Sequence, residues 1–367
     1  MLKHHATPDG TATYARRFAN FPDNYRDLFG LSVSSVGLGT YLGSEDQATD
    51  EAYTEAIRAA VSGGINFIDS AVNYRYQRSE RVIGSVLAKL SAAGVNRDQV
   101  VVATKGGYIA FDGEPPADPR QWFQKNFLEP GIVSPDDLIQ GSHCMTPRYL
   151  DAMLGTSRSN LGLETIDIYY VHNPETQLSA VSRLEFVQRI RSAFEFLEGA
   201  VAARKIGCYG VATWSGFRLK PHERAYLSLP ELVSVARDIG GSGHHFKIIQ
   251  LPYNLAMTEA LTLRNQTLPS GNEVSLLAAA EALGVAVCTS ATLLQGQLTR
   301  RLPEILRETF PGMESDAQRS IQFARSTPGI SLALIGMSSA SHVAHNLTTL
   351  RHPPAPDALM KLFTRAD

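Results

Sequence analysis

Four side chains in the first half of the sequence have types and spacings that suit proton transfer. Asp69 and Tyr74 lie five positions apart, and Lys105 and His172 follow later in the chain. A tyrosine has an ordinary pKa of about 10, so it is a poor proton donor at neutral pH. A nearby ammonium lowers that pKa, a carboxylate keeps the ammonium charged, and a histidine can orient a carbonyl oxygen or relay a proton. The four residues together suit protonation of a carbonyl oxygen while a hydride reaches its carbon.

The elements that must position these residues alternate between short apolar runs and amphipathic helical stretches. Eight apolar runs predict strands: Val36–Gly39, Ile65–Ile68, Val100–Thr104, Ile166–Val171, Ile206–Val211, Phe246–Leu251, Val285–Cys288 and Leu332–Ile335. Alternation of this kind favours a parallel sheet with helical crossovers, and eight units fit a closed barrel better than an open sheet. We therefore predict an α/β fold, a (β/α)₈ TIM barrel. Residues 1–25 form an N-terminal extension, residues 26–367 form a single barrel domain, and an insertion at about 108–145 follows the third strand.

A barrel of this type gathers the residues that close its strands. Asp69, Lys105 and His172 each follow an apolar run, and the C-terminal ends of barrel strands meet on one face, where active sites are built. For any one of them, an ordinary polar residue at a strand end is an equally good interpretation. For all three together with Tyr74, the interpretation as a site is favoured.

The same strand ends carry motifs that resemble those of the aldo-keto reductases, in the family's order from about residue 26 to residue 350. They are D-x-A-x-x-Y at Asp69–Tyr74, S-E-x-x-hydrophobic-G at Ser79–Gly84, T-K at Thr104–Lys105, D-hydrophobic-Y-x-x-H at Asp167–His172, and Q-x-x-Y-N at Gln250–Asn254. The resemblance implies a hydride-transferring oxidoreductase. Tyr74 would be the general acid, Lys105 and Asp69 its supporting pair, and His172 the residue that orients the substrate.

The resemblance also implies NADPH or NADP+ bound in an extended pose on the barrel face, with NADH as the alternative. Gly37-Leu-Gly39 is no dinucleotide-binding fingerprint, because Leu42 stands where the third glycine would be. The implied cofactor contacts are Gly39, Thr40, Tyr41, Asp69, Thr213, Gln250, Ser290, Leu293, Gly336, Ser338, His342 and Asn346.

Three positions depart from the family pattern around the cofactor. Thr213 stands where Ser-Asn often holds the carboxamide, Leu293 ends a segment without the usual stacking aromatic, and Ser338 stands where many members have arginine. Ser338, Ser339 and the pair Arg300-Arg301 are the candidates for a phosphate contact. Arginine is the residue that usually binds a phosphate through two hydrogen bonds. The Gly336–Asn346 loop contains no arginine, so we expect only a modest preference for NADPH over NADH.

The segment from Tyr108 to Cys144 is much longer than an ordinary barrel loop. One interpretation is a substrate lid, since the loop leaves from the active face. The other is a packed loop or a subunit contact. On the first interpretation the substrate-contacting aromatics are Tyr108, Trp122, Phe123 and, from another loop, Trp214. They would favour a bulky, partly apolar carbonyl compound.

Composition excludes several other classes of protein. The net charge of -2 favours neither a nucleic-acid surface nor an anionic membrane, and no apolar run reaches the roughly 20 residues of a membrane span. The polar N-terminal stretch lacks the apolar core of a signal peptide, which predicts a cytoplasmic protein. The three cysteines imply no disulfide framework. The pairs His4-His5 and His244-His245 lack the spacing of metal ligands, so no metal site is expected.

The expected partner is therefore a small carbonyl or alcohol substrate, and a homo-oligomer stays open. The main alternative is a cofactor-binding regulatory or redox-sensing subunit with little turnover. Retention of all four residues argues against a purely structural role. A third alternative, an unrelated barrel hydrolase or isomerase, would need a metal cluster or paired carboxylates, and the sequence offers neither.

Overall fold

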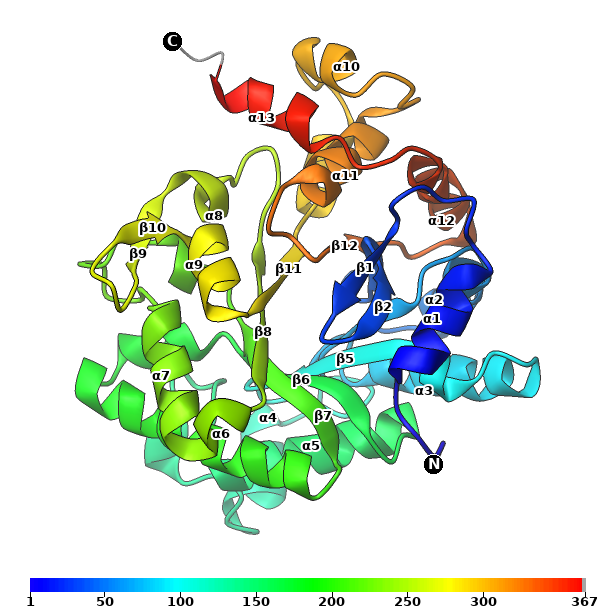
Figure 1. Cartoon of the computed structure of the whole chain (residues 1–367). Helices are drawn as coiled ribbons and strands as arrows, with labels where there is room; N and C mark the ends of the chain where they lie inside the picture. Colours follow the sequence, from blue (N-terminus) through cyan, green and yellow to red (C-terminus); the bar gives the residue numbers. More distant parts are fainter. Residues whose placement is uncertain (365–367) are drawn as a thin grey trace.

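The computed structural model describes residues 1–364 and contains a closed barrel of eight parallel strands, which confirms the predicted (β/α)₈ TIM barrel (Figure 1). Each barrel strand pairs with the next barrel strand along the chain, and the order is closed. In that order β11 lies between β8 and β12 and pairs with both. Each of the eight predicted runs overlaps one strand. The strands are β3 (Val36–Gly39), β4 (Phe67–Asp69), β5 (Val101–Gly106), β6 (Ile166–His172), β7 (Ile206–Ala212), β8 (Phe246–Pro252), β11 (Ala286–Ser290) and β12 (Leu332–Gly336).

The long helices surround the strands in Figure 1. They are α2 (Gln47–Ser62), α3 (Arg78–Ala92), α5 (Pro147–Leu161), α6 (Arg183–Ala202), α7 (Leu229–Gly240), α9 (Leu276–Leu283), α11 (Asp316–Ser326) and α12 (Ala340–Leu347). Several begin at a hydroxyl cap: Ser182 accepts from the Glu185 backbone N–H, and Ser228 accepts from that of Glu231. Their buried faces follow the helical period, because apolar residues three and four apart share one side.

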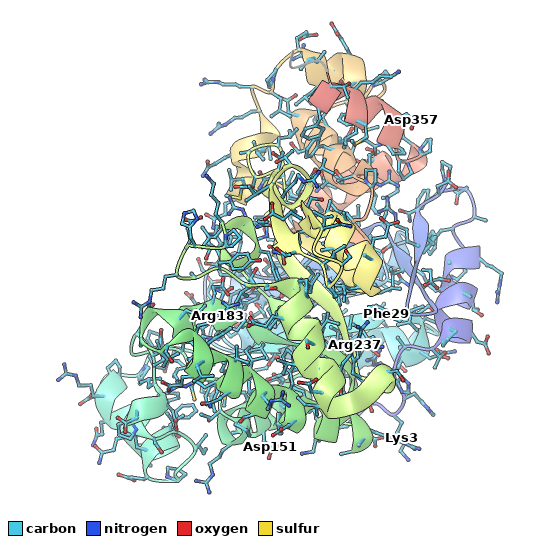
Figure 2. The ribbon with its side chains drawn as sticks, turned by 60° about the vertical axis from the view of Figure 1, so that its left-hand side comes forward. Lys3, Phe29, Asp151, Arg183, Arg237 and Asp357 are labelled. Carbon is cyan, nitrogen blue, oxygen red and sulfur yellow. The ribbon has the colours of Figure 1, made fainter. Side chains whose placement is uncertain are left out.

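Polar contacts between side chains also connect neighbouring helices. Arg183, at the start of α6, pairs with Glu231 of α7 and donates to the backbone oxygen of Tyr226 at 2.6 Å. Figure 2 labels Arg183 and, on α7, the exposed Arg237, both in the outer layer of helices. Within residues 1–364 no helix is both long enough and apolar enough to span a membrane.

The N-terminal segment forms a helix and leads into a hairpin that closes the bottom of the barrel. Helix α1 (Pro8–Arg16) begins at the Thr7 cap, and β1 (Tyr25–Leu28) pairs with β2 (Leu31–Ser34). Leu28 and Val33 of the hairpin join the apolar cluster inside the barrel. A helix after Thr-Pro-Asp follows the usual capping pattern, so the extension is more ordered than its polar composition indicates.

The chain also contains shorter helices and one further hairpin. The insertion after β5 holds α4 (Pro119–Phe123), a π-helical turn at Gln124–Leu128 and a 3₁₀ turn at Pro135–Asp137. The remaining α-helices and strands of residues 1–364 are α8 (Glu259–Thr262), the hairpin β9 (Arg264–Thr267) with β10 (Glu273–Ser275), α10 (Ile305–Thr309) and α13 (Pro356–Thr364).

Candidate active site

A cavity of about 980 Å³ opens at the C-terminal ends of the barrel strands. Asp69, Tyr74 and His172 line it, whereas Lys105 lies fully buried behind them. All of the predicted cofactor contacts lie in its lining: Gly39, Thr40, Tyr41, Asp69, Thr213, Gln250, Ser290, Leu293, Gly336, Ser338, His342 and Asn346. The barrel therefore brings together residues that are far apart in the sequence.

The deepest part of the site is a buried ion pair. Lys105 Nζ donates to Asp69 Oδ2 at 2.5 Å and to the backbone oxygen of Ser70 at 2.7 Å, and Gln250 Nε2 donates to Asp69 Oδ1 at 2.9 Å. Burial lowers the pKa of Lys105, but Asp69 and Tyr74 outweigh that effect and hold the pKa above its ordinary value. Burial raises the pKa of Asp69, and Lys105 opposes the shift. Lys105 therefore carries its charge at neutral pH.

Tyr74 lies beside this ion pair and also lines the cavity. Lys105 Nζ is 5.1 Å from the centre of the Tyr74 ring, and the rings of Tyr74 and His172 are 6.0 Å apart at 75°. One side of the phenol faces the cavity, yet protein surrounds the rest, and this desolvation raises its pKa above the ordinary value while Lys105 opposes the rise. The net shift is opposite to the one expected from Lys105 alone. Tyr74 is accordingly a protonated phenol, the form that an acid needs.

His172 completes the wall of the cavity. Burial, followed by the charge of Lys105, lowers the pKa of His172 well below its ordinary value. The imidazole is therefore neutral at neutral pH. Its Nδ1 atom is buried and has no hydrogen-bond partner among residues 1–364, and the Tyr108 ring meets the His172 ring edge-on at 5.1 Å. A neutral imidazole beside a phenol can donate to or accept from a substrate oxygen.

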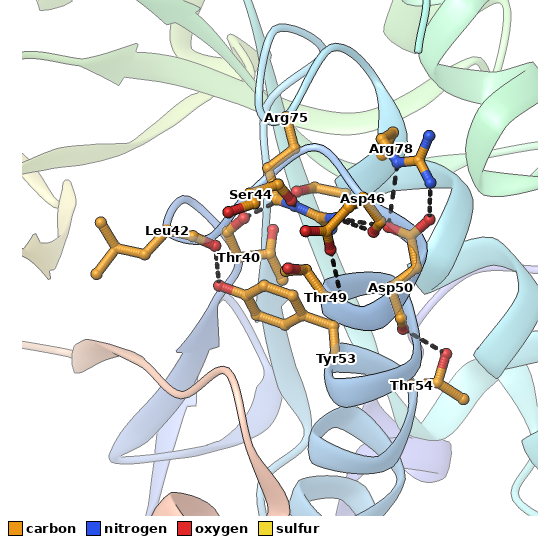
Figure 3. Close-up of polar contacts among 11 residues, drawn as sticks. Thr40, Leu42, Ser44, Asp46, Thr49, Asp50, Tyr53, Thr54, Arg75 and Arg78 are labelled. Atoms are coloured by element: carbon orange, nitrogen blue, oxygen red, sulfur yellow. Dashed lines mark hydrogen bonds and ion pairs between the residues drawn. The ribbon is translucent and has the colours of Figure 1, made fainter. Parts of the chain in front are cut away.

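One polar network that the sequence analysis missed holds the loop between β3 and α2 (Figure 3). Arg75 donates to the backbone oxygens of Ser44 (2.8 Å) and Asp46 (3.2 Å) and to Asp50 Oδ1 (2.6 Å). Tyr53 Oη donates to the backbone oxygen of Leu42 at 2.7 Å. Arg75 has a φ of +48°, a conformation that favours glycine. The left-handed backbone of Arg75 directs its side chain toward no partner that the sequence pattern names, so this network is visible only in the folded chain.

The region expected to hold a nicotinamide cofactor offers polar groups without partners. Thr213 Oγ1 is buried in the cavity lining with no hydrogen-bond partner among residues 1–364. The following loop is held by Glu175 Oε1, which accepts from the backbone N–H groups of Trp214 (2.8 Å), Ser215 (3.0 Å) and Gly216 (3.3 Å). The residues therefore fit a ligand that carries a carboxamide.

The opposite end of the cavity is lined by uncharged polar side chains and histidines. Its polar residues include several that the sequence analysis did not single out: Gln295, Gln297, Thr299 and His345. Within residues 1–364 the lining contains neither arginine nor lysine, so the predicted phosphate candidates Arg300 and Arg301 lie outside it. No group of three or more His, Cys, Asp or Glu residues in that same range is placed to hold a metal.

The aromatic residues predicted to contact substrate separate into two groups. Tyr108 and Trp214 line the cavity, but Trp122 and Phe123 do not. The Trp122 ring packs on Phe111 at 5.0 Å, and Phe123 stacks on Phe127 at 5.5 Å. Trp122 and Phe123 therefore lie outside the lining of this cavity, and their contact with substrate stays a prediction. These rings are costly to leave in water, so they pack inside the insertion.

Comparison with known proteins gives the class of protein that this fold and site define. A model of the aldo/keto reductase family matches residues 35–366. The chain belongs to the aldo/keto reductase family. It is 30% identical over 184 residues to a D-threo-aldose 1-dehydrogenase of a Pseudomonas species, a match over 48% of this chain and 51% of that protein. The match thus spans only about half of that curated relative.

Solved structures show the same fold at low sequence identity. An aldo-keto reductase of Klebsiella pneumoniae in complex with NADPH has a TM-score of 0.62 and 20% identity, over 94% of each chain. The glycerol dehydrogenase of Gluconobacter oxydans has a TM-score of 0.62 and 19% identity, over 95% of each chain.

Proposed function

We propose that this protein is an NADPH-dependent oxidoreductase that interconverts a carbonyl compound and an alcohol, with Tyr74 as the general acid. The observation that carries the proposal is the charged Lys105, paired with buried Asp69 and placed 5.1 Å from the Tyr74 ring at the wall of a large cavity. Family membership supports the same chemistry.

The bound nicotinamide would supply or accept the hydride. The chain's own residues manage the proton. Tyr74 would donate its phenolic proton to the carbonyl oxygen during reduction, and in the reverse direction the phenolate form of Tyr74 would take the proton of the alcohol. Lys105 stabilises the phenolate that remains, because an ammonium next to a phenolate favours the charged form. Asp69 holds Lys105 in place, and Gln250 holds Asp69.

The other cavity residues orient the reactants. His172 is neutral and faces Tyr74, so it would bind the same substrate oxygen without competing for the proton. Thr213 would hold the carboxamide of the cofactor, and Ser338, His342 and Asn346 would contact its adenosine end. A cavity of this size suits a dinucleotide with a small substrate, since ordinary ligand pockets reach about 1,000 Å³.

Two relatives inform the choice of ligands. The reductase of Klebsiella pneumoniae was solved with NADPH, which supports that cofactor here. The Pseudomonas relative is named for an aldose substrate, which makes aldoses a reasonable part of any substrate panel. The cytoplasmic location, the domain division at residues 25 and 26, and a homo-oligomer all stay predictions.

Steady-state oxidation of NADPH with a panel of aldehydes, ketones and aldoses, and reduction of NADP+ with the matching alcohols and aldoses, tests the proposal. We expect turnover with at least one substrate class. Cofactor binding without turnover across the panel would instead favour the regulatory-subunit alternative.

A further inference from the structure

The insertion that follows β5 carries a buried histidine to the end of β6. At the base of the insertion Tyr108 and His143 form an antiparallel bridge, and Cys144 N–H donates to the backbone oxygen of Gly107 at 2.8 Å. His143 is fully buried. Its Nε2 atom lies 2.7 Å from the backbone oxygen of His172. The insertion therefore reaches the strand end that carries the imidazole of the site.

The other ring nitrogen of His143 has a partner whose orientation is fixed. Arg189 donates to Gln177 Oε1 at 2.5 Å, so the amide nitrogen of Gln177 faces His143 Nδ1, at 2.8 Å. An amide nitrogen can only donate, so His143 Nδ1 must accept, and the ring proton must stand on Nε2. His143 Nε2–H then donates to the His172 oxygen. Burial lowers the pKa of His143 to about 4, so it stays neutral.

Close packing around His172 leaves little freedom at this point. A Cβ on Gly107 would lie 2.7 Å from the His172 oxygen and 3.1 Å from His143 Nε2, so only glycine lets the insertion approach this closely. The Tyr108 ring meets the rings of both His143 and His172 edge-on, each at 5.1 Å.

The bonds of His143 also span a turn. After His172 the chain passes through Asn173, with a φ of +46°, into the 3₁₀ helix Pro174–Ser179, which carries Gln177. His143 thus holds the last residue of β6 with one nitrogen and the following helix with the other. The backbone sets the direction of the Cα–Cβ bond and restricts the side-chain rotamers, so fixing the His172 peptide limits the directions open to its imidazole.

We propose that His143 is a positioning residue for His172, kept in a single neutral tautomer by the Arg189–Gln177 pair. The inference rests on the proposed function for its catalytic meaning, because it assigns His172 a role toward substrate. It gives the insertion a function different from a lid: its base supports the site from behind, while its aromatic cluster packs on itself and on Val72, Tyr149 and Met153.

The first test uses the unaltered protein and does not depend on activity. Long-range ¹⁵N–¹H spectra of ¹⁵N-histidine-labelled protein distinguish the protonated from the unprotonated ring nitrogen. We expect the neutral Nε2–H tautomer for His143 at neutral pH. A protonated Nδ1 or a charged ring would overturn the proposal. This result stands even if no substrate is turned over, so it separates this inference from the proposed function.

The second test compares two variants that differ in one donor. His143→Leu removes the side-chain N–H, and His143→Gln keeps a side-chain N–H donor at this position. We expect His143→Leu to lower kcat on the order of tenfold, as misplacement of an orienting group does, with unchanged cofactor affinity and shifted ¹⁵N signals of His172. His143→Gln should restore most of kcat and the His172 signals.

Phe127→Leu is the matched control, because Phe127 is buried in the insertion's aromatic cluster and does not line the cavity. It should lower Tm and leave kcat and the His172 signals unchanged. The proposal fails if Phe127→Leu lowers kcat as much as His143→Leu does, or if His143→Gln restores nothing. Should His143→Leu not fold, the tautomer in the unaltered protein and the signals of His143→Gln decide the question.

Discussion

The Tyr41 ring packs edge-on against the Tyr74 ring, with their centres 5.0 Å apart at 62°. Tyr41 belongs to the loop between β3 and α2, and 56% of its surface is exposed, so the ring depends on the loop for its place. Arg75, which follows Tyr74 in the chain, holds that loop through the oxygens of Ser44 and Asp46. The loop and the proposed general acid are therefore fixed by one network.

Two substitutions at Arg75 separate its bonding from its strained backbone. Arg75→Ala removes the bonds but keeps a residue that disfavours φ of +48°, and we expect a loss of about 2 kcal/mol in unfolding free energy and a higher KM. Arg75→Gly removes the same bonds without the strain and should be more stable than Arg75→Ala by about 1 kcal/mol. Urea unfolding and steady-state kinetics measure both.

Arg58→Ala is the control for this pair, because Arg58 pairs with Glu55 on the exposed side of α2 with 54% of its side chain in solvent. It should change neither quantity measurably. Equal stability of Arg75→Ala and Arg75→Gly would contradict the account of the left-handed backbone.

Removal of the phenolic proton should abolish most turnover. Tyr74→Phe is expected to lower kcat by about 10²–10⁴-fold, the usual contribution of a general acid. Lys105→Met should act similarly, because burial, Asp69 and Tyr41 all raise the pKa of Tyr74, and Lys105 is the group that opposes the rise. Stopped-flow turnover and fluorescence titration of the cofactor are the measurements. Cofactor affinity of Tyr74→Phe should stay within about twofold, and near-normal kcat in this variant would remove the central assignment.

The difference in affinity between NADPH and NADH should be small. We expect NADPH to bind more tightly than NADH, but by about tenfold or less, or 1.4 kcal/mol, because the described lining has no arginine or lysine. Ser338→Arg should widen the preference, since a guanidinium binds a phosphate with two hydrogen bonds. Fluorescence titration of both reduced cofactors decides this. Equal or tighter binding of NADH by the unaltered protein would refute the preference.

The unfolding free energy should decrease as the pH falls below neutral, and His143 should contribute to this decrease. Its pKa in the folded protein is about 4, below the ordinary 6.5, so the unfolded chain binds more protons between those values. The contribution of His143 is therefore fully present above about pH 6.5 and is lost as pH falls toward about 4. His143→Gln should make the unfolding free energy less steep in this window. An unchanged slope would mean that His143 does not titrate on unfolding.

Trp122 and Phe123 should matter for stability rather than for substrate choice. Their rings pack on Phe111 and Phe127, away from the cavity lining. Alanine at either position should cost about 1–3 kcal/mol of unfolding free energy, somewhat less than a fully buried aromatic. KM should change by the same factor for small and large carbonyl substrates. A selective rise of KM for large substrates would return these rings to the pocket.

Local patterns were sufficient to predict the barrel, and the family resemblance added the predicted cofactor contacts in the cavity lining. Strands such as Ile166–His172 are short, mostly apolar runs rich in β-branched residues. This pattern can be recognised in the sequence without knowing which strands lie beside them. The rule that strand ends converge on one face of a barrel then predicts that Asp69, Lys105 and His172 lie together. The family motifs named the cofactor contacts, and the structure places all of those residues in one cavity, although their roles stay proposals.

The surroundings of these residues depended on contacts that no local pattern encodes. The bond between His143 and His172 joins an insertion to a strand 29 positions later, and Gln250 reaches Asp69 across 181 positions. Burial also reversed the expected direction of the Tyr74 pKa, because the desolvation that opposes Lys105 arises only once the chain surrounds the ring. The sequence supplied the reactive groups and their approximate location. Folding determined their protonation states and supports, because both depend on which distant atoms exclude water from each group.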